Sequence, residues 1–374
     1  MSTIAVNAIT DASGGSAASI NGYTPSASNM TGRNRIINGA MMIDQRNAGA
    51  SVTVNASFYT YPIDRFAGFG EPTDGVFTLQ QSSTAPAGFT NSLVATVTTA
   101  DSSIGATQRY FIRQVIEGYN VADMGFGASG ASTFTLSFWT RSSLTGTFGG
   151  SFMNENFDRA YPFTYTINAA NTWEQKTITV TGDTSGTWLK TNGGGLYVFW
   201  SIGAGSSRTG TAGAWQTPAS PLFGATGQTN IISTNGATFY ITGVQLEVGS
   251  TASEFEHRQY GQELALCQRY YWQRSLFNFN ASTAVWEGYY GGGFGVLNID
   301  LPVTMRAAPT LTVIAPTQVQ VYETPGWTNR TIAAQYSTPD LVAFGVNSTS
   351  HSHGKLLTLS GGSTIPIGQM SSEL

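Results

Sequence analysis

The clearest candidate for chemistry in this sequence is a pair of histidines, His351 and His353, separated by one residue. On a β-strand, residues two apart point to the same side, so one chain would offer two imidazoles to one ligand. Two imidazoles are too few to enclose a metal ion. Three chains meeting at an axis would offer six, an octahedral set suited to iron or nickel. The alternative is a pair of exposed loop histidines, because Asn347, Ser348 and Ser350 lie beside them.

Aromatic residues near glycine-rich loops form a second candidate site, since pyranose rings stack on aromatic faces while polar groups bond the hydroxyls. The segment EGYYGGGFG at 287–295 places two tyrosines in such a loop. We predict saccharide or receptor contact at Trp286, Tyr289, Tyr290 and Trp327. Similar surroundings make Trp188, Trp200 and Trp215 candidates earlier in the chain. The alternative for each ring is a place in a core or a subunit interface.

No catalytic set accompanies these residues. The third histidine, His257, is far from the pair in sequence, and no Gly-x-Ser-x-Gly motif is present. Carboxylates that could cleave glycans are available at Asp64, Glu71, Glu155 and Asp158. Acids in such ordinary contexts are usually solvated turn residues, so we predict no catalytic residues and no enzymatic activity.

Composition limits the class of protein. Only 10% of the 374 residues are charged, against about 25% in ordinary globular proteins, and 44 are glycine. A surface this poor in charge indicates burial in an assembly, because charge normally keeps a monomer soluble. The net charge of −4, with only three lysines, argues against a nucleic-acid partner.

We expect no targeting signal in this sequence. The segment MSTIAVNAITDASGG has neither the basic nor the apolar region of a signal peptide, and no apolar run is long enough for membrane insertion. We therefore expect synthesis in a cytoplasm. The single cysteine, Cys267, permits no intrachain disulfide and lies among apolar residues, which favours a buried thiol.

The elements that carry these residues are mostly strands. Residues 1–33 are too polar to fold alone, and are either a disordered tail or an extended arm that orders on a partner. Residues 34–257 read as a β-sandwich or jelly roll. Its strand candidates are 34–42, 76–81, 93–98, 108–116, 133–140, 146–153, 173–181, 195–202 and 238–248. Within TFTLSFWT at 133–140, Phe134, Leu136 and Phe138 should face the core and the alternate residues a wet face or a groove.

A change of period follows. Tyr260, Leu264, Cys267 and Tyr271 are spaced four, three and four apart, which predicts a linking helix within 258–272. Residues 273–374 return to short strands and fit a second small β-sandwich. The predicted fold is therefore mainly β, with an arm, a jelly roll, a short helix and a C-terminal β domain.

Several segments carry a family resemblance. The first is NRIINGAMMIDQRNAG at 34–49 with YPIDRFAG at 61–68, which resembles the opening of a domain in tailed-bacteriophage tail fibre proteins. Residues 239–272 are similar to the segment that closes this domain. LPVTMRAAPTLTV at 301–313, with the end at 371–374, looks like their C-terminal tip, and residues 2–15 look like their attachment arm. His-x-His pairs bind metal at the threefold axis of some proteins of this kind.

The 34–257 domain also resembles jelly-roll carbohydrate-binding modules, many of which hold a structural calcium. This sequence departs from them at the expected ligand positions, with Met41 and Met42 in the opening and Thr242 and Gly243 in the closing strand. Calcium needs about six to eight oxygen ligands. These departures argue against a calcium site.

The resemblance implies a virion protein of the phage tail: a fibre or tail-tip subunit, non-enzymatic and homotrimeric, that attaches to a host-surface glycan or receptor. The arm would bind tail or baseplate proteins, and the 273–374 domain would face the receptor. One alternative is a baseplate or capsid adaptor or decoration protein without a receptor role. Another is a tailspike depolymerase acting on host polysaccharide.

Overall fold

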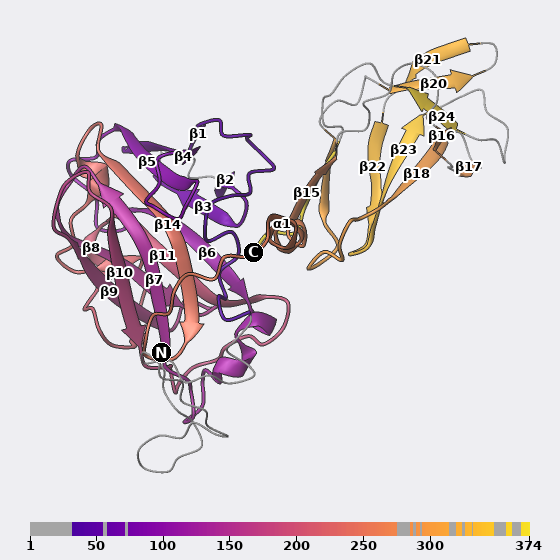
Figure 1. The fold of residues 1–374 in the computed structure, drawn as a ribbon. Coiled ribbons are helices and arrows are strands. Elements are labelled where there is room, and N and C mark those ends of the chain that lie inside the picture. Colours follow the sequence, from indigo (N-terminus) through magenta and orange to yellow (C-terminus); the bar gives the residue numbers. More distant parts are fainter. Residues whose placement is uncertain are drawn as a thin grey trace, which may run out of the picture. The chain divides into compact units, whose positions relative to one another are not determined.

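The computed structural model divides the chain into two units, Met1–Arg258 and Gln259–Leu374 (Figure 1). It describes residues 32–54, 58–71, 74–274, 285–286, 289–291, 294–313, 319–323, 326–330, 332–347, 357–360 and 368–374. In both units the paired strands are antiparallel, apart from one short parallel pair in the first. This mainly β architecture confirms the fold class predicted from the sequence.

Two six-stranded sheets form the first unit, and each is named here by a central strand. The β14 sheet has the order β1 (Val52–Thr53), β4 (Val76–Ser82), β5 (Ser92–Thr99), β14 (Thr238–Val248), β7 (Phe134–Ser142), β10 (Glu174–Val180). The β11 sheet has the order β2 (Thr60–Ile63), β3 (Phe66–Phe69), β6 (Arg109–Glu117), β11 (Gly194–Ala204), β8 (Gly146–Met153), β9 (Ala160–Ile167). The parallel pair is β12 (Thr209–Gly210) with β13 (Gly224–Ala225). Short 3-10 turns lie at Gly118–Asn120, Ala122–Met124, Ser206–Arg208 and Ile231–Ser233.

The alternation of strand residues builds the core of this unit. Phe134, Leu136 and Phe138 of β7 are fully buried, as predicted. The opposite face of β7 is covered at its start by the chain beyond β14, whereas Trp139 and Arg141 further along this face stay partly exposed. Thr135 is buried as well, and its hydroxyl donates to the carbonyl of Gly249 at 2.7 Å. Both faces of this strand therefore carry packed residues.

The opening segment at 34–42 was predicted as a strand, and this prediction is wrong. The chain turns at Asn38, whose φ of 61° is left-handed. On either side of this turn the segment still bonds to β14: the Arg35 N–H donates to Leu246 O at 2.8 Å, and the Val244 N–H donates to Gly39 O at 2.9 Å. The opening segment thus occupies the edge of β14 where β5 has ended.

Strand β14 lies centrally in its sheet, antiparallel to both β5 and β7. Its register against β7 shifts between Thr242 and Gln245. Gly243 lies in this bulge with a left-handed φ of 58°, and a Cβ there would come within 2.6 Å of the Phe89 ring. The bulge therefore requires glycine at the position where an acidic calcium ligand would otherwise be expected.

The second unit contains α1 (Tyr260–Gln268) and three small sheets. The sheet orders are β15 (Tyr271–Arg274), β25 (Gly368–Ser371), β19 (Thr310–Val313); β16 (Val285–Trp286), β24 (Leu357–Ser360), β20 (Val319–Glu323), β21 (Gly326–Arg330); and β17 (Tyr289–Gly291), β18 (Phe294–Asp300), β23 (Leu341–Asn347), β22 (Ile332–Ser337). Within the described ranges, the chain has no helix with the length and hydropathy that membrane crossing demands.

The helix packs differently from its predicted stripe. Cys267 is fully buried, as expected, but Tyr260 is 57% exposed and Glu263 is buried instead. Nearby, β25 pairs with both β15 and β19, and the Arg306 guanidinium donates to Ser372 O at 2.7 Å. The segments at 301–313 and 371–374, which carried the resemblance to a tip, thus lie together beside the start of this unit.

Candidate functional site

The β11 sheet turns a second row of aromatic residues away from the core. On β11, Leu196, Val198 and Trp200 belong to the core, so the alternate residues Tyr197 and Phe199 face outward. On the adjacent strand β6, the same alternation places Arg109, Phe111 and Arg113 on the outer side. Arginine and aromatic side chains therefore share the outer face of one sheet.

Seven rings form a continuous set, which we name the aromatic array: Tyr59, Phe69, Phe111, Phe157, Tyr197, Phe199 and Phe223. Phe111 is its centre. The ring centroid of Phe111 lies 5.4 Å from Phe69 and 4.8 Å from Phe223, both stacked, and 5.0 Å from Phe199 edge to face. Such offset and edge contacts are the arrangements that aromatic pairs prefer. The array is thus a second packed layer outside the sandwich core.

Two arginines lie against these rings. The Cζ atom of Arg113 is 3.4 Å from the ring centroid of Tyr59 and 5.5 Å from that of Tyr197. The Cζ atom of Arg109 is 4.8 Å from the ring of Phe69 and 5.4 Å from that of Phe223. Each guanidinium therefore joins two rings through cation–π contact, which holds the rings in fixed positions.

Exposure changes sharply across the array. Phe111 and Phe199 are buried, whereas Tyr59 is 42% exposed and its neighbour Phe58 is 77% exposed. At the other end, the Tyr197 hydroxyl bonds to Glu155 Oε2 at 2.7 Å. Burial and this bond raise the pKa of Tyr197. The result is a rigid aromatic base with exposed rings at one edge and a carboxylate at the other.

A pocket of about 330 Å³ opens on another side of the same unit, between the edge strands β9 and β10. Its lining consists of Tyr161, Phe163, Thr164, Thr177, Ile178, Thr179, Ala212 and Gly213. The Tyr161 ring packs edge to face on Trp215 at 5.3 Å, and Trp215 Nε1 donates to Thr181 O at 2.7 Å. The pocket combines one aromatic wall with several hydroxyls, but the described charged side chains do not line it.

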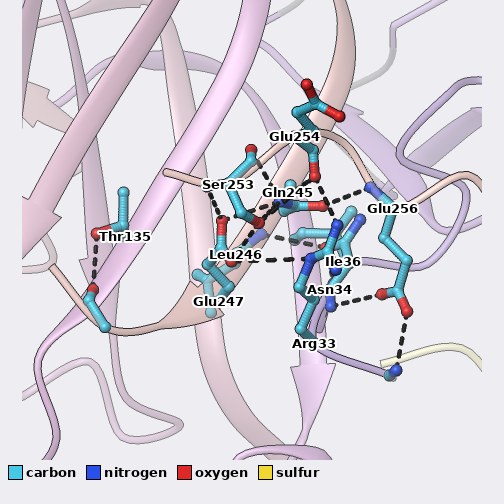
Figure 2. A network of polar contacts seen from close by, with 12 residues as sticks. Arg33, Asn34, Ile36, Thr135, Gln245, Leu246, Glu247, Ser253, Glu254 and Glu256 are labelled. Atoms are coloured by element: carbon cyan, nitrogen blue, oxygen red, sulfur yellow. Dashed lines mark hydrogen bonds and ion pairs between the residues drawn. The ribbon is translucent and has the colours of Figure 1, made fainter. Parts of the chain in front are cut away.

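A polar network ties the opening segment to the end of the domain, and Figure 2 shows it around Asn34. The Asn34 side chain donates to Val244 O at 3.1 Å and accepts from the Leu246 N–H at 3.1 Å. Glu256 accepts from the N–H groups of Gly32 and Asn34, both at 2.8 Å. The backbone N–H groups of Gly32 and Asn34 in the opening segment are thus bonded by the Glu256 side chain, and the Asn34 side chain bonds to the backbone of β14.

The carboxylate of Glu247 completes the network. It is buried and accepts from the Ser253 N–H at 2.8 Å, from the Ser253 hydroxyl at 2.7 Å and from Gln245 Nε2 at 2.9 Å (Figure 2). Arg33 Nε lies 3.9 Å from it. The described part of the chain holds no cluster of three or more metal-ligating side chains. Hydrogen bonds and ion pairs thus connect the two ends of the domain.

The residues predicted from the sequence fall in several places. His351 and His353 lie outside the described residues, so their metal site stays a prediction. Trp286 is on β16 and Trp327 on β21, which belong to one sheet, while Tyr289 and Tyr290 are on β17 of another sheet. Their side chains also lie outside the described part, and their glycan contact stays a prediction.

The tryptophans of the first unit are described. Trp200 is fully buried in the core, and Trp188 is buried and donates to Ser185 O at 3.0 Å, so saccharide contact by these two rings was a wrong interpretation. Trp215 is partly exposed beside the pocket. The aromatic array was missed, although the alternation of Arg109, Phe111 and Arg113 in β6 is a signal that a sequence can give.

No protein-family model matches the chain, and neither does any curated protein sequence. Solved structures that are similar to it include the enzymatically active domain of tailspike protein 4 from bacteriophage CBA120, at 13% identity and a TM-score of 0.31, over 58% of this chain and 21% of that chain. Carbohydrate-binding modules are also among them. One is TmCBM61 in complex with β-1,4-galactotriose, at 9% identity and a TM-score of 0.27, over 58% of this chain and 99% of that one.

A further module is the family 11 carbohydrate-binding module of Clostridium thermocellum in complex with a mixed-linked tetrasaccharide, at 10% identity and a TM-score of 0.27, over 55% of this chain and 98% of that one. All three similarities are weak. They carry no argument about function, which must come from the residues themselves.

Proposed function

We propose that this protein is a subunit of a phage tail fibre or tail tip that attaches to a host-surface glycan without cleaving it. The observation that carries the proposal is the ring of Tyr59, 42% exposed and held by the Arg113 guanidinium 3.4 Å away on a buried aromatic base. A sugar ring stacks best on a face that is both accessible and fixed.

The rigidity of the array matters for affinity. Ordering a free side chain on binding costs about 0.5–1.5 kcal/mol. Tyr59 contacts Phe69 at 5.8 Å as well as Arg113. Its ring is therefore already ordered in the free protein and loses little conformational freedom when a ligand binds. Phe58, the preceding residue, is 77% exposed and adds a second exposed ring at this point of the chain. The edge of the β11 sheet is therefore prepared for a flat, partly apolar ligand.

The place in a virion rests on sequence. The segments at 34–49, 61–68 and 239–272 resemble phage tail proteins, and 10% charged residues indicate an assembled surface. We propose that three chains associate, that the 1–33 arm binds tail or baseplate proteins, and that the 273–374 domain also reaches the host surface. The alternative role of an adaptor or decoration protein would need no exposed, supported ring.

Three of the four acids considered for cleavage have other partners. Asp64 is fully buried and accepts from Gln45 Nε2 at 2.5 Å and Arg46 Nη1 at 3.0 Å. Glu155 bonds to Tyr197, and Asp158 accepts from Asn154 Nδ2 at 2.5 Å. These contacts give the three acids structural roles, which supports a binding protein over a depolymerase.

Substitution of Tyr59 tests the proposal. Tyr59→Ala should weaken binding to a panel of bacterial surface polysaccharides about tenfold, because loss of one stacking ring removes roughly 1.4 kcal/mol. Tyr59→Phe should retain most affinity. The matched control is Tyr119→Ala, since Tyr119 is 60% exposed in the same unit but lies outside the array.

The purified chain should also compete with phage for host cells, and a reducing-end assay should detect no new ends. If Tyr59→Ala and the unsubstituted protein bind the polysaccharides with equal affinity, the aromatic array is not the glycan-binding site. Release of reducing ends from a polysaccharide would replace attachment with depolymerisation.

A further inference from the structure

One end of the aromatic array holds a second arginine beside Arg109. Arg208 ends the 3-10 turn Ser206–Arg208, and its Nε donates to Thr107 O at 3.1 Å, two residues before Arg109. Phe223 links the two arginines: its ring lies 5.4 Å from the Cζ of Arg109, and its N–H donates to Arg208 O at 2.8 Å. Both guanidinium groups thus lie at the same end of the β11 sheet, and both residues are partly exposed.

This pair differs from Arg46, Arg159 and Lys176 of the same unit, each of which has a carboxylate partner. Arg46 pairs with Asp64 at 3.0 Å, Arg159 with Asp183 at 2.6 Å and Lys176 with Glu174 at 2.6 Å. Within the described residues, neither Arg109 nor Arg208 has a carboxylate within 4 Å. Burial and the charge of Arg109 both lower the pKa of Arg208, and Glu71 opposes them only in part. Two like charges therefore lie near each other with no carboxylate of the described residues within 4 Å, and Glu71 offsets their repulsion only in part.

We infer that Arg109 and Arg208 bind the anionic group, a carboxylate or a phosphate, of an acidic saccharide that stacks on the aromatic array. The inference rests on the proposed function and names the class of ligand. The Arg109 guanidinium lies over the Phe69 and Phe223 rings, and cation–π contact leaves N–H groups of a guanidinium free to donate to an acceptor. A planar guanidinium meets carboxylate or phosphate through two parallel hydrogen bonds.

The energetic reason for an anion is local. A neutral hydroxyl would bond to either arginine but would leave the repulsion between the two charges in place. An anion between them replaces repulsion by two attractions in a partly buried setting, where water screens less. The Phe69 and Phe223 rings contribute an apolar floor, so the site favours a sugar that carries the anion over a free ion.

Matched ligands test this inference. A uronate oligosaccharide and a sugar-phosphate oligosaccharide are each compared by calorimetry with a neutral counterpart, reduced at the carboxyl or dephosphorylated. The protein should bind at least one anionic chain about tenfold or more tightly than its neutral counterpart. The comparison that gives the larger ratio of anionic to neutral affinity identifies the carboxylate or the phosphate as the natural group. Raising the salt concentration should reduce the anionic affinity and leave the neutral one almost unchanged.

Substitutions locate the effect. Arg109→Gln and Arg208→Gln should each reduce the anionic preference at least threefold. Arg208→Gln should also spare the neutral affinity, because Arg208 is not one of the two arginines that hold the rings of the array. The control is Arg141→Gln, because Arg141 also contacts a ring, that of Tyr240 at 5.0 Å, and donates to Asn171 O, but belongs to the β14 sheet. It should leave both affinities unchanged.

The outcomes separate the two proposals. Equal binding of anionic and neutral chains overturns the arginine site and leaves glycan attachment standing. Binding of neither kind of chain overturns both. Loss of anionic preference in Arg141→Gln to the same extent as in Arg208→Gln shows a general charge effect and overturns the site.

Discussion

Asn38 stabilises the opening turn through its side chain and through its tolerance of a left-handed backbone. Its Nδ2 donates to Ile43 O at 2.8 Å and Asp64 O at 2.9 Å, and its Oδ1 accepts from the Ile43 N–H at 2.9 Å. Asn38→Ala should destabilise the protein by about 3 kcal/mol, since it loses three buried hydrogen bonds and puts alanine at a φ of 61°. Urea unfolding measures this change.

Asn38→Gly separates the two causes. It loses the same bonds but accepts the left-handed φ, so it should be about 1 kcal/mol less destabilising than Asn38→Ala. Equal destabilisation by both variants would show that the backbone at this turn is not strained. A loss under about 1 kcal/mol in Asn38→Ala would show that the side chain contributes little.

Among the elements, the crossing from β9 to β10 depends on one carboxylate. Glu174 Oε1 accepts from the N–H groups of Asn168 and Ala169 at 2.9 Å, and Oε2 accepts from Lys176 Nζ at 2.6 Å. Burial alone would raise the pKa of Glu174, but these bonds lower it from 4.5 to about 2. The folded protein therefore binds this proton less readily than the unfolded chain.

The sign of the pH effect follows from this lowered pKa. The stabilisation by Glu174 is fully present above about pH 4.5 and disappears as the pH falls toward 2. Because solvent screens this edge, we expect a contribution of about 1 kcal/mol. Glu174→Gln should abolish that part of the acid sensitivity, measured by urea unfolding at pH 5 and pH 2. Glu254→Gln, at an exposed carboxylate, should keep the full sensitivity.

Most strands of the first unit follow from the sequence because period-2 alternation is strong where one face meets a core. The predicted 133–140 and 173–181 lie over β7 and β10. Strand β9 was missed because Pro162 argues against a strand interior. Its position at the edge of the β11 sheet explains the exception, since an edge strand tolerates a missing N–H.

The errors have physical reasons too. At 34–42, apolar residues suggested a strand, but the Asn38-Gly39 pair turns the chain, and this dipeptide is a turn signal. The aromatic array escaped because β11 is apolar on both faces, so an outward row reads like a core row. When both alternating sets of side chains are apolar, the sequence alone does not show which set faces the core and which is packed on the outer side of the sheet.

At the scale of the whole molecule, the prediction is a homotrimer. Few charges and several exposed rings, at Phe58, Tyr119, Tyr260 and Tyr336, leave apolar surface that association would cover. Light scattering on the eluted protein should give the mass of three chains at micromolar concentration. A monomer at that concentration, without added partner, would contradict the prediction and with it any site built on a threefold axis.

A trimer gives the histidine pair its chemistry, because only three chains supply six imidazoles. We expect one iron or nickel ion per three chains by elemental analysis. Chelation should lower the melting temperature of the trimer, since metal bound only by the assembled form stabilises it. His353→Ala should remove the metal and the effect of the chelator. His257→Ala should change neither, because His257 packs against Phe89 and Phe255 in the first unit. Trimers that contain no stoichiometric transition metal would leave His351 and His353 as loop residues.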